Sequence, residues 1–128
     1  MIFDENNKAI YLQIVDRICD DIMQCRYGPE TRLPSVREYA ASIEVNANTV
    51  MRSYERLTSK GLIYNKRGIG FFVSPDARER IIRERKVELI DRQLPPLFKL
   101  MRHLGISPDD LSNAYKDFSS GEDKGLIC

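Results

Sequence analysis

The chain has 128 residues, of which 42% are hydrophobic and 30% charged, and its formal net charge is +1. These values are typical of an ordinary soluble globular protein with one domain and a small appendage, and no apolar run approaches the roughly 20 residues that span a bilayer. The first ten residues are acidic and polar where a signal peptide would be basic and then apolar, so we expect a cytoplasmic protein with no membrane contact.

The cysteines and the single histidine do not indicate a metal or catalytic site. The three cysteines have no metal-ligand spacing, Cys19 lies on the apolar side of a helical pattern, and His103 has no imidazole partner. The sequence has no Ser-His-Asp set. The Gly-Ile-Gly segment at 68–70 belongs to a hairpin, so it is not a nucleotide-binding loop. We therefore expect neither an enzyme nor a cofactor.

Residues 9–25 are predicted to form an amphipathic helix. Isoleucine recurs every four residues, at 10, 14, 18 and 22, and charged side chains lie opposite. Gly28 permits a left-handed cap and Pro29 cannot continue a helix, so the helix is expected to end before them.

Two further helices are predicted from their capping residues. Ser35 and Glu38 form a capping box, in which each side chain accepts a hydrogen bond from the backbone N–H of the other. Asn46 is a good N-cap for a third helix that runs to about Lys60, and Gly61 stops it. The expected buried side of the two helices is Val36, Tyr39, Ala40, Ile43, Val50, Tyr54 and Leu57.

Two short strands are predicted at 62–64 and 71–73, joined by a turn that is rich in glycine and positive charge. Helix, helix, tight turn, helix and hairpin is the order of a winged helix-turn-helix. We therefore predict a mainly α fold with a small β-hairpin wing, in a domain that spans residues 1–75.

Residues 76–128 are predicted to form a helical tail for dimerisation. Its apolar residues alternate steps of three and four, as in a heptad seam, and a Pro-Pro pair predicts two helices or a sharp kink near Leu94. Ser107 is the expected N-cap of a last helix, whose apolar side can fold back over part of the seam. The seam comprises Val87, Ile90, Leu94, Leu97, Met101 and Leu104, and the apolar side of the last helix comprises Leu111, Tyr115 and Phe118.

The segment from Leu33 to Val73 resembles the DNA-binding domain of the GntR family of bacterial regulators. With its short tail, the chain is most similar to the YtrA subfamily, which has a small helical region where other members carry a large effector domain. Ala47 and Phe71 depart from the family, because many relatives have Pro and Thr at these positions. The matching segments are LPSVRE at 33–38, VNANTV at 45–50, GLI at 61–63 and the wing at 66–73, with YLQI at 11–14 before the first helix.

The resemblance implies a DNA-binding transcriptional regulator, and the charge distribution agrees with it. Between Arg32 and Arg67 there are seven basic and three acidic side chains, a balance of +4, so a nearly neutral chain can present one basic face. On the third helix, Asn48 can pair with adenine and Arg52 with guanine or a phosphate, and Ser53 is expected on the same outward side. The candidate DNA-binding residues are Ser35, Arg37, Asn46, Ala47, Asn48, Thr49, Arg52, Arg56, Lys66, Arg67 and Gly68.

Other interpretations of these residues stay open. The outward side of the third helix can be a merely solvated surface, and a basic hairpin tip is common on any surface. Arg37 can instead pair with Glu38 or Glu44. The domain can also be a module that binds another protein, which would lack the salt-dependent retention on double-stranded DNA that a regulator shows.

We expect a homodimer on a palindromic operator, and a repressor rather than an activator, because repression needs only occupancy of a promoter. The seam can instead close the core of each monomer. The YtrA resemblance implies control of a neighbouring operon, often one that encodes an ABC transporter. The tail is small for a cavity of about 300–1,000 Å³ that would enclose a small-molecule effector, so the sequence identifies none.

Overall fold

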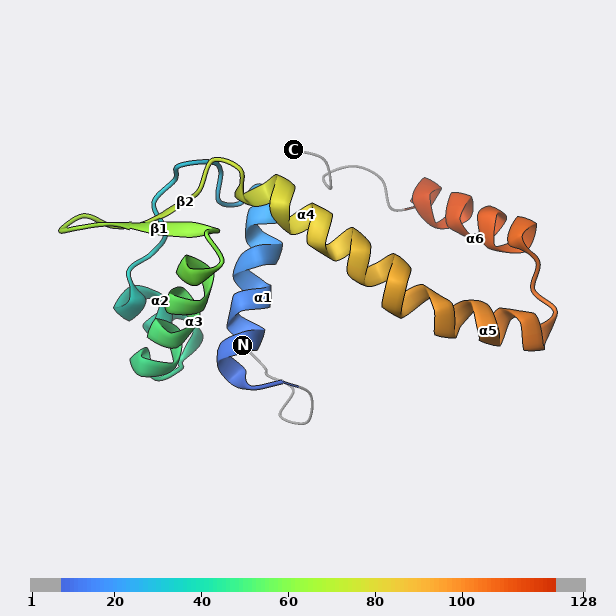
Figure 1. Ribbon diagram of the computed structural model, residues 1–128, viewed down its shortest axis with the longest axis horizontal. Helices are drawn as coiled ribbons and strands as arrows, with labels where there is room; N and C mark the ends of the chain where they lie inside the picture. The colour runs from blue at the N-terminus through green and yellow to red at the C-terminus, as the bar shows by residue number, and fades with distance from the viewer. Residues whose placement is uncertain (1–7, 122–128) are drawn as a thin grey trace. The chain divides into compact units, whose positions relative to one another are not determined.

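The computed structural model describes residues 8–121, which fall into two compact units divided between Ile82 and Arg83 (Figure 1). No helix in this range is long and apolar enough to cross a membrane. The predicted fold, mainly α with a β-hairpin wing, is confirmed. In chain order the elements are α1 (Ile10–Met23), α2 (Val36–Ile43), α3 (Ala47–Ser59), β1 (Ile63–Lys66), β2 (Gly70–Val73), α4 (Ala77–Glu88), the π-helix η1 (Leu89–Gln93), α5 (Leu94–Leu104) and α6 (Pro108–Gly121).

Helix α1 is shorter than predicted at both ends. It ends at Met23 rather than near residue 25, because the backbone turns to a positive φ of 63° at Cys25, ahead of Gly28 and Pro29. The isoleucines at 14, 18 and 22 are buried as expected, and so is Cys19. Ile10 is 40% exposed, contrary to the prediction, since it lies in the first turn and borders an open hollow instead of the core.

Both predicted helix caps are present. The Ser35 hydroxyl accepts from the Glu38 N–H at 3.1 Å, and the Glu38 carboxylate accepts from the Ser35 N–H at 3.0 Å. These hydrogen bonds from Ser35 hold the pKa of Glu38 below its usual value. The capping box therefore stabilises the folded protein at a pH above the pKa that Glu38 has in the unfolded chain. This stabilisation is lost as the pH falls through the lower pKa that Glu38 has in the folded protein. Asn46 caps α3 by accepting from the Asn48 N–H at 2.7 Å.

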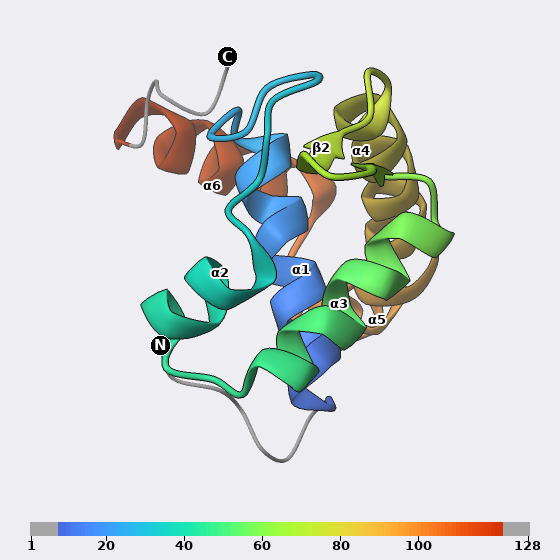
Figure 2. The ribbon, with the colours of Figure 1, turned by 90° about the vertical axis from the view of Figure 1, so that its left-hand side faces the viewer.

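The core of the first unit lies between α1, α2 and α3, which Figure 2 shows with the tight turn that joins α2 to α3. Glu44 in that turn adopts a left-handed conformation with φ 56°. The predicted stripe of α3 is fully buried, and three of the four residues expected for α2 are buried, whereas Val36 is only partly covered. The buried residues of this stripe and of α2 are Tyr39, Ala40, Ile43, Val50, Tyr54 and Leu57.

Ser53 corrects the sequence-based expectation for α3, because it is fully buried instead of lying on the outward side. Its hydroxyl donates to the backbone carbonyl of Tyr11 at 2.8 Å and also lies 3.2 Å from the Thr49 carbonyl. A buried hydroxyl needs such partners. Ser53 therefore joins α3 to the first turn of α1.

Strands β1 and β2 form an antiparallel hairpin in which Ile63 pairs with Val73 and Lys66 with Gly70. The ladder starts one residue later than predicted in β1 and one residue earlier in β2. On its other side, β2 is bonded to the extended segment before α2, since the Leu33 N–H donates to the Phe71 carbonyl at 2.8 Å. The wing is thus fixed to the chain that enters α2.

The first turns of α4 belong to the first unit. Ala77 and Ile81 are buried in its core. Arg78 donates to the Met23 carbonyl at 2.9 Å, and Arg80 donates to the Gly61 carbonyl at 3.1 Å. These arginines satisfy backbone carbonyls at the C-terminal ends of α1 and α3, where a positive charge is also favoured by the helix dipole.

The second unit is built from the rest of α4, η1, α5 and α6. Two helices or a sharp kink were predicted near Leu94, and the structure has the π-helical turn η1 there, after which the two prolines occupy the first turn of α5. The backbone remains helical at Glu88, Gln93 and Leu94, so the helix changes its winding without being interrupted. The predicted cap of α6 is also present, because the Ser107 hydroxyl accepts from the Asp110 N–H at 3.1 Å. Of the seam, Met101 is buried and Leu94 half-buried, and the other four residues are exposed.

Replacing Ser35 with alanine removes the acceptor of the Glu38 N–H at the start of α2. We expect the free energy of unfolding to fall by about 0.5–2 kcal/mol, as at other N-caps, measured by chemical denaturation. Glu38→Gln keeps a carbonyl oxygen for the Ser35 N–H and is the control with the smaller loss. A Ser35→Ala variant that is fully stable but has lost affinity for DNA would assign this hydroxyl to a phosphate contact instead.

Candidate nucleic-acid interface

Helix α3 and its N-cap carry six of the eleven candidate residues. Asn48 and Arg52 are exposed in the N-terminal half of the helix, where Thr49 is half-buried, and Arg56 is exposed in the last turn. The oxygen of the Asn46 side chain is used as the helix cap, so Asn46 contributes first to the helix itself. The N–H groups of Asn48, Thr49 and Val50 already donate to Asn46, so it is the positive end of the helix dipole that favours an anion such as a phosphate here.

Helix α2 contributes one basic side chain to the candidate set. Arg37 is exposed, and among residues 8–121 it forms no ion pair, either with Glu38 or with Glu44. Glu38 is instead engaged with Ser35 in the capping box. The guanidinium of Arg37 is therefore available to a ligand, whereas the Ser35 hydroxyl already has a structural partner.

The wing presents its basic residues at the end of the hairpin. Arg67 and Gly68 lie in an exposed turn, closed by the Ile69 N–H donating to the Lys66 carbonyl at 2.9 Å. Gly68 has φ 78° and nothing within 4 Å of the place a Cβ would take, so backbone conformation rather than space requires glycine there. The Lys66 ammonium lies 4.5 Å from the centre of the Phe72 ring, an attractive cation–π distance.

Three residues at this interface were missed from the sequence. Met51 is 38% exposed on α3 next to Arg52, which its helical position could have indicated. Arg32 packs its guanidinium over Gly70, with Nε 2.9 Å from the place of a Cβ on that glycine. Tyr11 contacts Arg52 from another helix, and no local pattern connects two positions so far apart.

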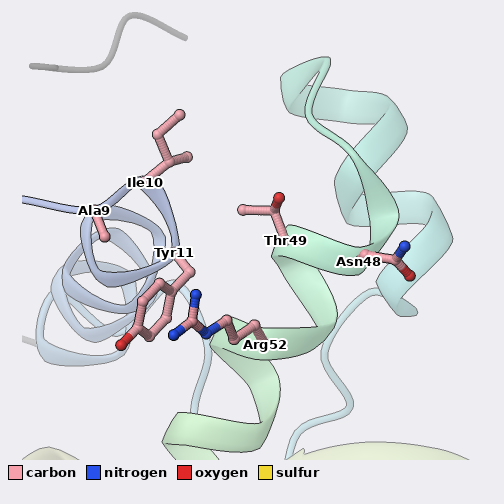
Figure 3. A pocket seen from close by; sticks show the side chains of 6 residues that line it. All are labelled: Ala9, Ile10, Tyr11, Asn48, Thr49 and Arg52. Carbon is pink, nitrogen blue, oxygen red and sulfur yellow. The ribbon is translucent and has the colours of Figure 1, made fainter.

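The contact between Tyr11 and Arg52 lies in an open hollow of about 370 Å³ between the first turns of α1 and α3 (Figure 3). The Arg52 side chain extends toward the Tyr11 ring, with its guanidinium carbon 3.9 Å from the ring centre. The hollow is lined by Ala9, Ile10, Tyr11, Asn48, Thr49 and Arg52. Its position at the start of α3 suits the edge of a base or a phosphate, and no cluster of metal-ligating side chains is found within residues 8–121.

Comparison with known proteins gives a consistent result. Residues 10–73 match the family model described as bacterial regulatory proteins, gntR family. The HTH-type transcriptional repressor YtrA of Bacillus subtilis is 32% identical over 115 residues, which cover 90% of this chain and 88% of YtrA. A crystal structure of a GntR-family transcriptional regulator from Bacteroides thetaiotaomicron superimposes with a TM-score of 0.74 at 50% identity, covering 90% of this chain and all of that one (100%).

One matched structure contains DNA. The DNA-binding domain of AraR in complex with operator ORR3 superimposes with a TM-score of 0.52 at 27% identity, covering 58% of this chain and 89% of that one. The likeness thus extends to a domain of the same kind bound to an operator, and the candidate residues of α3 and the wing lie in the unit that carries this fold.

Proposed function

The chain belongs to the GntR family of bacterial regulatory proteins, and we propose that this DNA-binding transcriptional regulator is a repressor that acts as a homodimer on a palindromic operator. The observation that carries the proposal is the division of exposed residues between the two units. Basic and polar side chains are exposed on α3 and the wing, whereas a row of apolar side chains is exposed in the second unit. The proposal assigns DNA binding to residues 1–75 and dimerisation to residues 76–128.

In this proposal α3 enters the major groove. Asn48 and Arg52 have the donors and acceptors that distinguish base edges there, and the exposed Met51 offers an apolar contact for a thymine methyl group. Arg37 and Arg56 flank these residues and would contact backbone phosphates. Such contacts set affinity and register but carry no sequence information.

The wing would contact the backbone or the minor groove beside α3. Arg67 is exposed in the turn, and Gly68 lets the backbone come close to a phosphate. Lys66 exchanges its weak contact with Phe72 for a phosphate on binding.

Dimerisation is supported by the exposure of the seam. Val87, Ile90, Leu97 and Leu104 are all more than two-fifths exposed, at 56%, 59%, 43% and 64%. Leaving this row of large apolar side chains in water is unfavourable, and a second copy of the same seam would cover it. A dimer also has a second DNA-binding domain, which can bind a second half-site of the operator. One small module alone covers too little DNA to single out one promoter.

The repressor assignment rests on the likeness to YtrA, which is named a transcriptional repressor, and on the small size of the second unit. Occupying a promoter blocks transcription without any further contact, whereas activation requires a surface that recruits polymerase. As in the YtrA group, we propose that the regulated genes form a neighbouring operon that encodes a transporter.

Arg52→Ala tests base reading by α3. We expect affinity for the preferred site to fall by about 1–3 kcal/mol, with relaxed preference at one base position, because a base-specific hydrogen-bond pair is lost. Affinities for the selected operator and its single-base variants measure this. The control is Arg26→Ala, which also removes one arginine charge, just after the C-terminal end of α1, where Arg26 pairs with Asp21. It should leave the preference at each base position unchanged. An unchanged profile in Arg52→Ala would remove this residue from the interface.

Replacing both Lys66 and Arg67 with alanine tests the wing. We expect weaker binding to all sequences alike, and a salt dependence reduced by about one unit of slope per lost phosphate contact. Ile69→Ala alters the same turn without changing its charge and is the control. Retention of the full salt slope by the double variant would show that these residues are only a solvated hairpin tip.

Leu97→Glu tests the seam by placing a charge in it. We expect monomers in sedimentation and loss of tight binding to a palindrome, while the winged unit stays folded. Leu97 is preferable to Met101, which is buried within its own unit. Lys99→Glu also adds negative charge to α5, but on the opposite side of the helix, and should remain dimeric. A Leu97→Glu dimer with full affinity would refute this seam as the interface.

A further inference from the structure

We propose that Tyr11 is a positioning residue for DNA recognition: its ring holds the Arg52 guanidinium in the orientation that reads a base. The inference rests on the proposed contact between Arg52 and DNA and adds the first turn of α1 to the recognition machinery. The stacking distance of 3.9 Å is well inside the range in which an aromatic face attracts a cation. Tyr11 is half-buried while Arg52 is exposed, so the less mobile partner is the ring.

A stacked guanidinium keeps its hydrogen bonds available. Arginine is planar and carries its five N–H donors around the edge of the plane, whereas stacking uses only the flat side. The Tyr11 ring therefore fixes the plane of Arg52 without occupying the donors that a guanine would accept. The hollow beside them, bordered by Asn48 and Thr49, leaves room for a base edge in front of the guanidinium (Figure 3).

The position of Tyr11 is itself fixed from α3. The Ser53 hydroxyl, which is fully buried, donates to the Tyr11 carbonyl at 2.8 Å. Arg52 and Ser53 are consecutive, so one segment of α3 contacts Tyr11 twice, at its ring and at its backbone. Because both contacts come from the same segment of α3, they hold the Tyr11 ring in place relative to Arg52.

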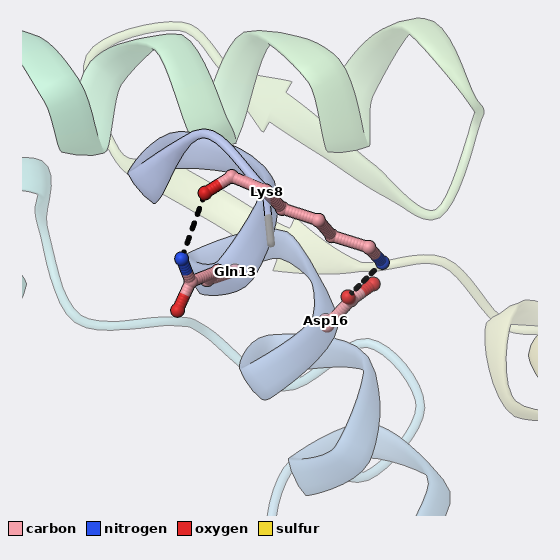
Figure 4. Close-up of polar contacts among 3 residues, drawn as sticks. All are labelled: Lys8, Gln13 and Asp16. Carbon is pink, nitrogen blue, oxygen red and sulfur yellow. Dashed lines mark hydrogen bonds and ion pairs between the residues drawn. The ribbon is translucent and has the colours of Figure 1, made fainter. Parts of the chain in front are cut away.

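The first turn of α1 is also held on its outer side (Figure 4). Gln13 donates from its side chain to the Lys8 carbonyl at 2.8 Å, which ties the residue before the N-cap to the end of the first turn. The Lys8 ammonium pairs with Asp16 at 2.6 Å. The N-cap residue, Ala9, has no side-chain cap, so these contacts provide the restraint that a capping side chain would otherwise give.

Positioning matters here because arginine has many side-chain conformations. Immobilising a long side chain on binding costs conformational entropy, and a side chain that is ordered before the ligand arrives avoids part of this cost. Tyr11 would therefore increase affinity for the base that Arg52 reads and leave affinity for other sequences nearly unchanged. A role that only joined α1 to α3 would instead weaken all sequences together.

The test compares Tyr11→Phe and Tyr11→Leu in the full chain, each alone and combined with Arg52→Ala. The probes are the operator selected from random DNA and its single-base variants. We expect Tyr11→Leu to weaken operator binding roughly 2- to 30-fold and to lose discrimination at the base pair that Arg52→Ala also relaxes. Tyr11→Phe retains the ring and should restore both. In the Arg52→Ala background, Tyr11→Leu should cause no further loss.

The outcomes separate this proposal from the proposed DNA contact. If Arg52→Ala relaxes one base position but Tyr11→Leu does not, the contact stands and positioning by Tyr11 is refuted. If Arg52→Ala changes neither the affinity nor the base preference, the proposed DNA contact of Arg52 and the positioning role of Tyr11 are both refuted. Equal weakening of all sequences by Tyr11→Leu with a lowered Tm would show a purely structural role. Tighter binding by Tyr11→Leu would show that the ring withholds Arg52 from DNA, which also overturns the proposal. The Ser53 hydroxyl donates to the backbone carbonyl of Tyr11, so this hydrogen bond is retained in each Tyr11 variant.

Discussion

The buried side chain of Tyr54 holds together the parts of the winged unit that carry the proposed DNA-binding residues. Its hydroxyl donates to the Pro34 carbonyl at 2.7 Å, on the segment that enters α2. Its ring meets Tyr39 of α2 and Phe71 of β2 edge to face, with ring centres 6.2 Å and 5.1 Å apart. Burial raises the pKa of this hydroxyl well above its usual value, so it stays protonated and able to donate. One residue of α3 thereby fixes α2 and the wing relative to the recognition helix.

Three consecutive residues of α3 divide the work of placing the helix. Tyr54 faces the core, Ser53 bonds to the backbone of α1, and Arg52 lies on the solvent side against the Tyr11 ring. A helix advances about 100° per residue, so three neighbours point in three different directions. The recognition surface therefore depends on two scaffolding contacts that are adjacent to it in sequence. Substitutions at Ser53 or Tyr54 would disturb DNA binding without touching DNA.

The sequence predicted the features that depend on neighbouring residues. The capping box at Ser35 and the cap at Asn46 follow from a spacing of two or three residues, and the buried stripe of α3 follows from helical periodicity. The sequence wrongly predicted that Ser53 faces outward, because a small polar residue at the edge of the stripe does not indicate a buried carbonyl that can accept its hydrogen bond. The contact between Tyr11 and Arg52 joins two helices, and only the tertiary structure brings them together. The motif at 11–14 indicated the family, but it did not indicate the proposed positioning role of the Tyr11 ring.

Phe71 shows how a departure from the family pattern is accommodated. A large aromatic residue replaces the small polar one of many relatives, and it packs against the Tyr54 ring as part of the margin of the core. The other end of the wing is free of this constraint, since Gly68 and Arg67 are exposed. The base of the hairpin is thus set by aromatic packing and its tip by charge and backbone freedom. Substitutions at the base would therefore shift the whole wing, whereas substitutions at the tip would alter only its proposed contacts with the phosphate backbone.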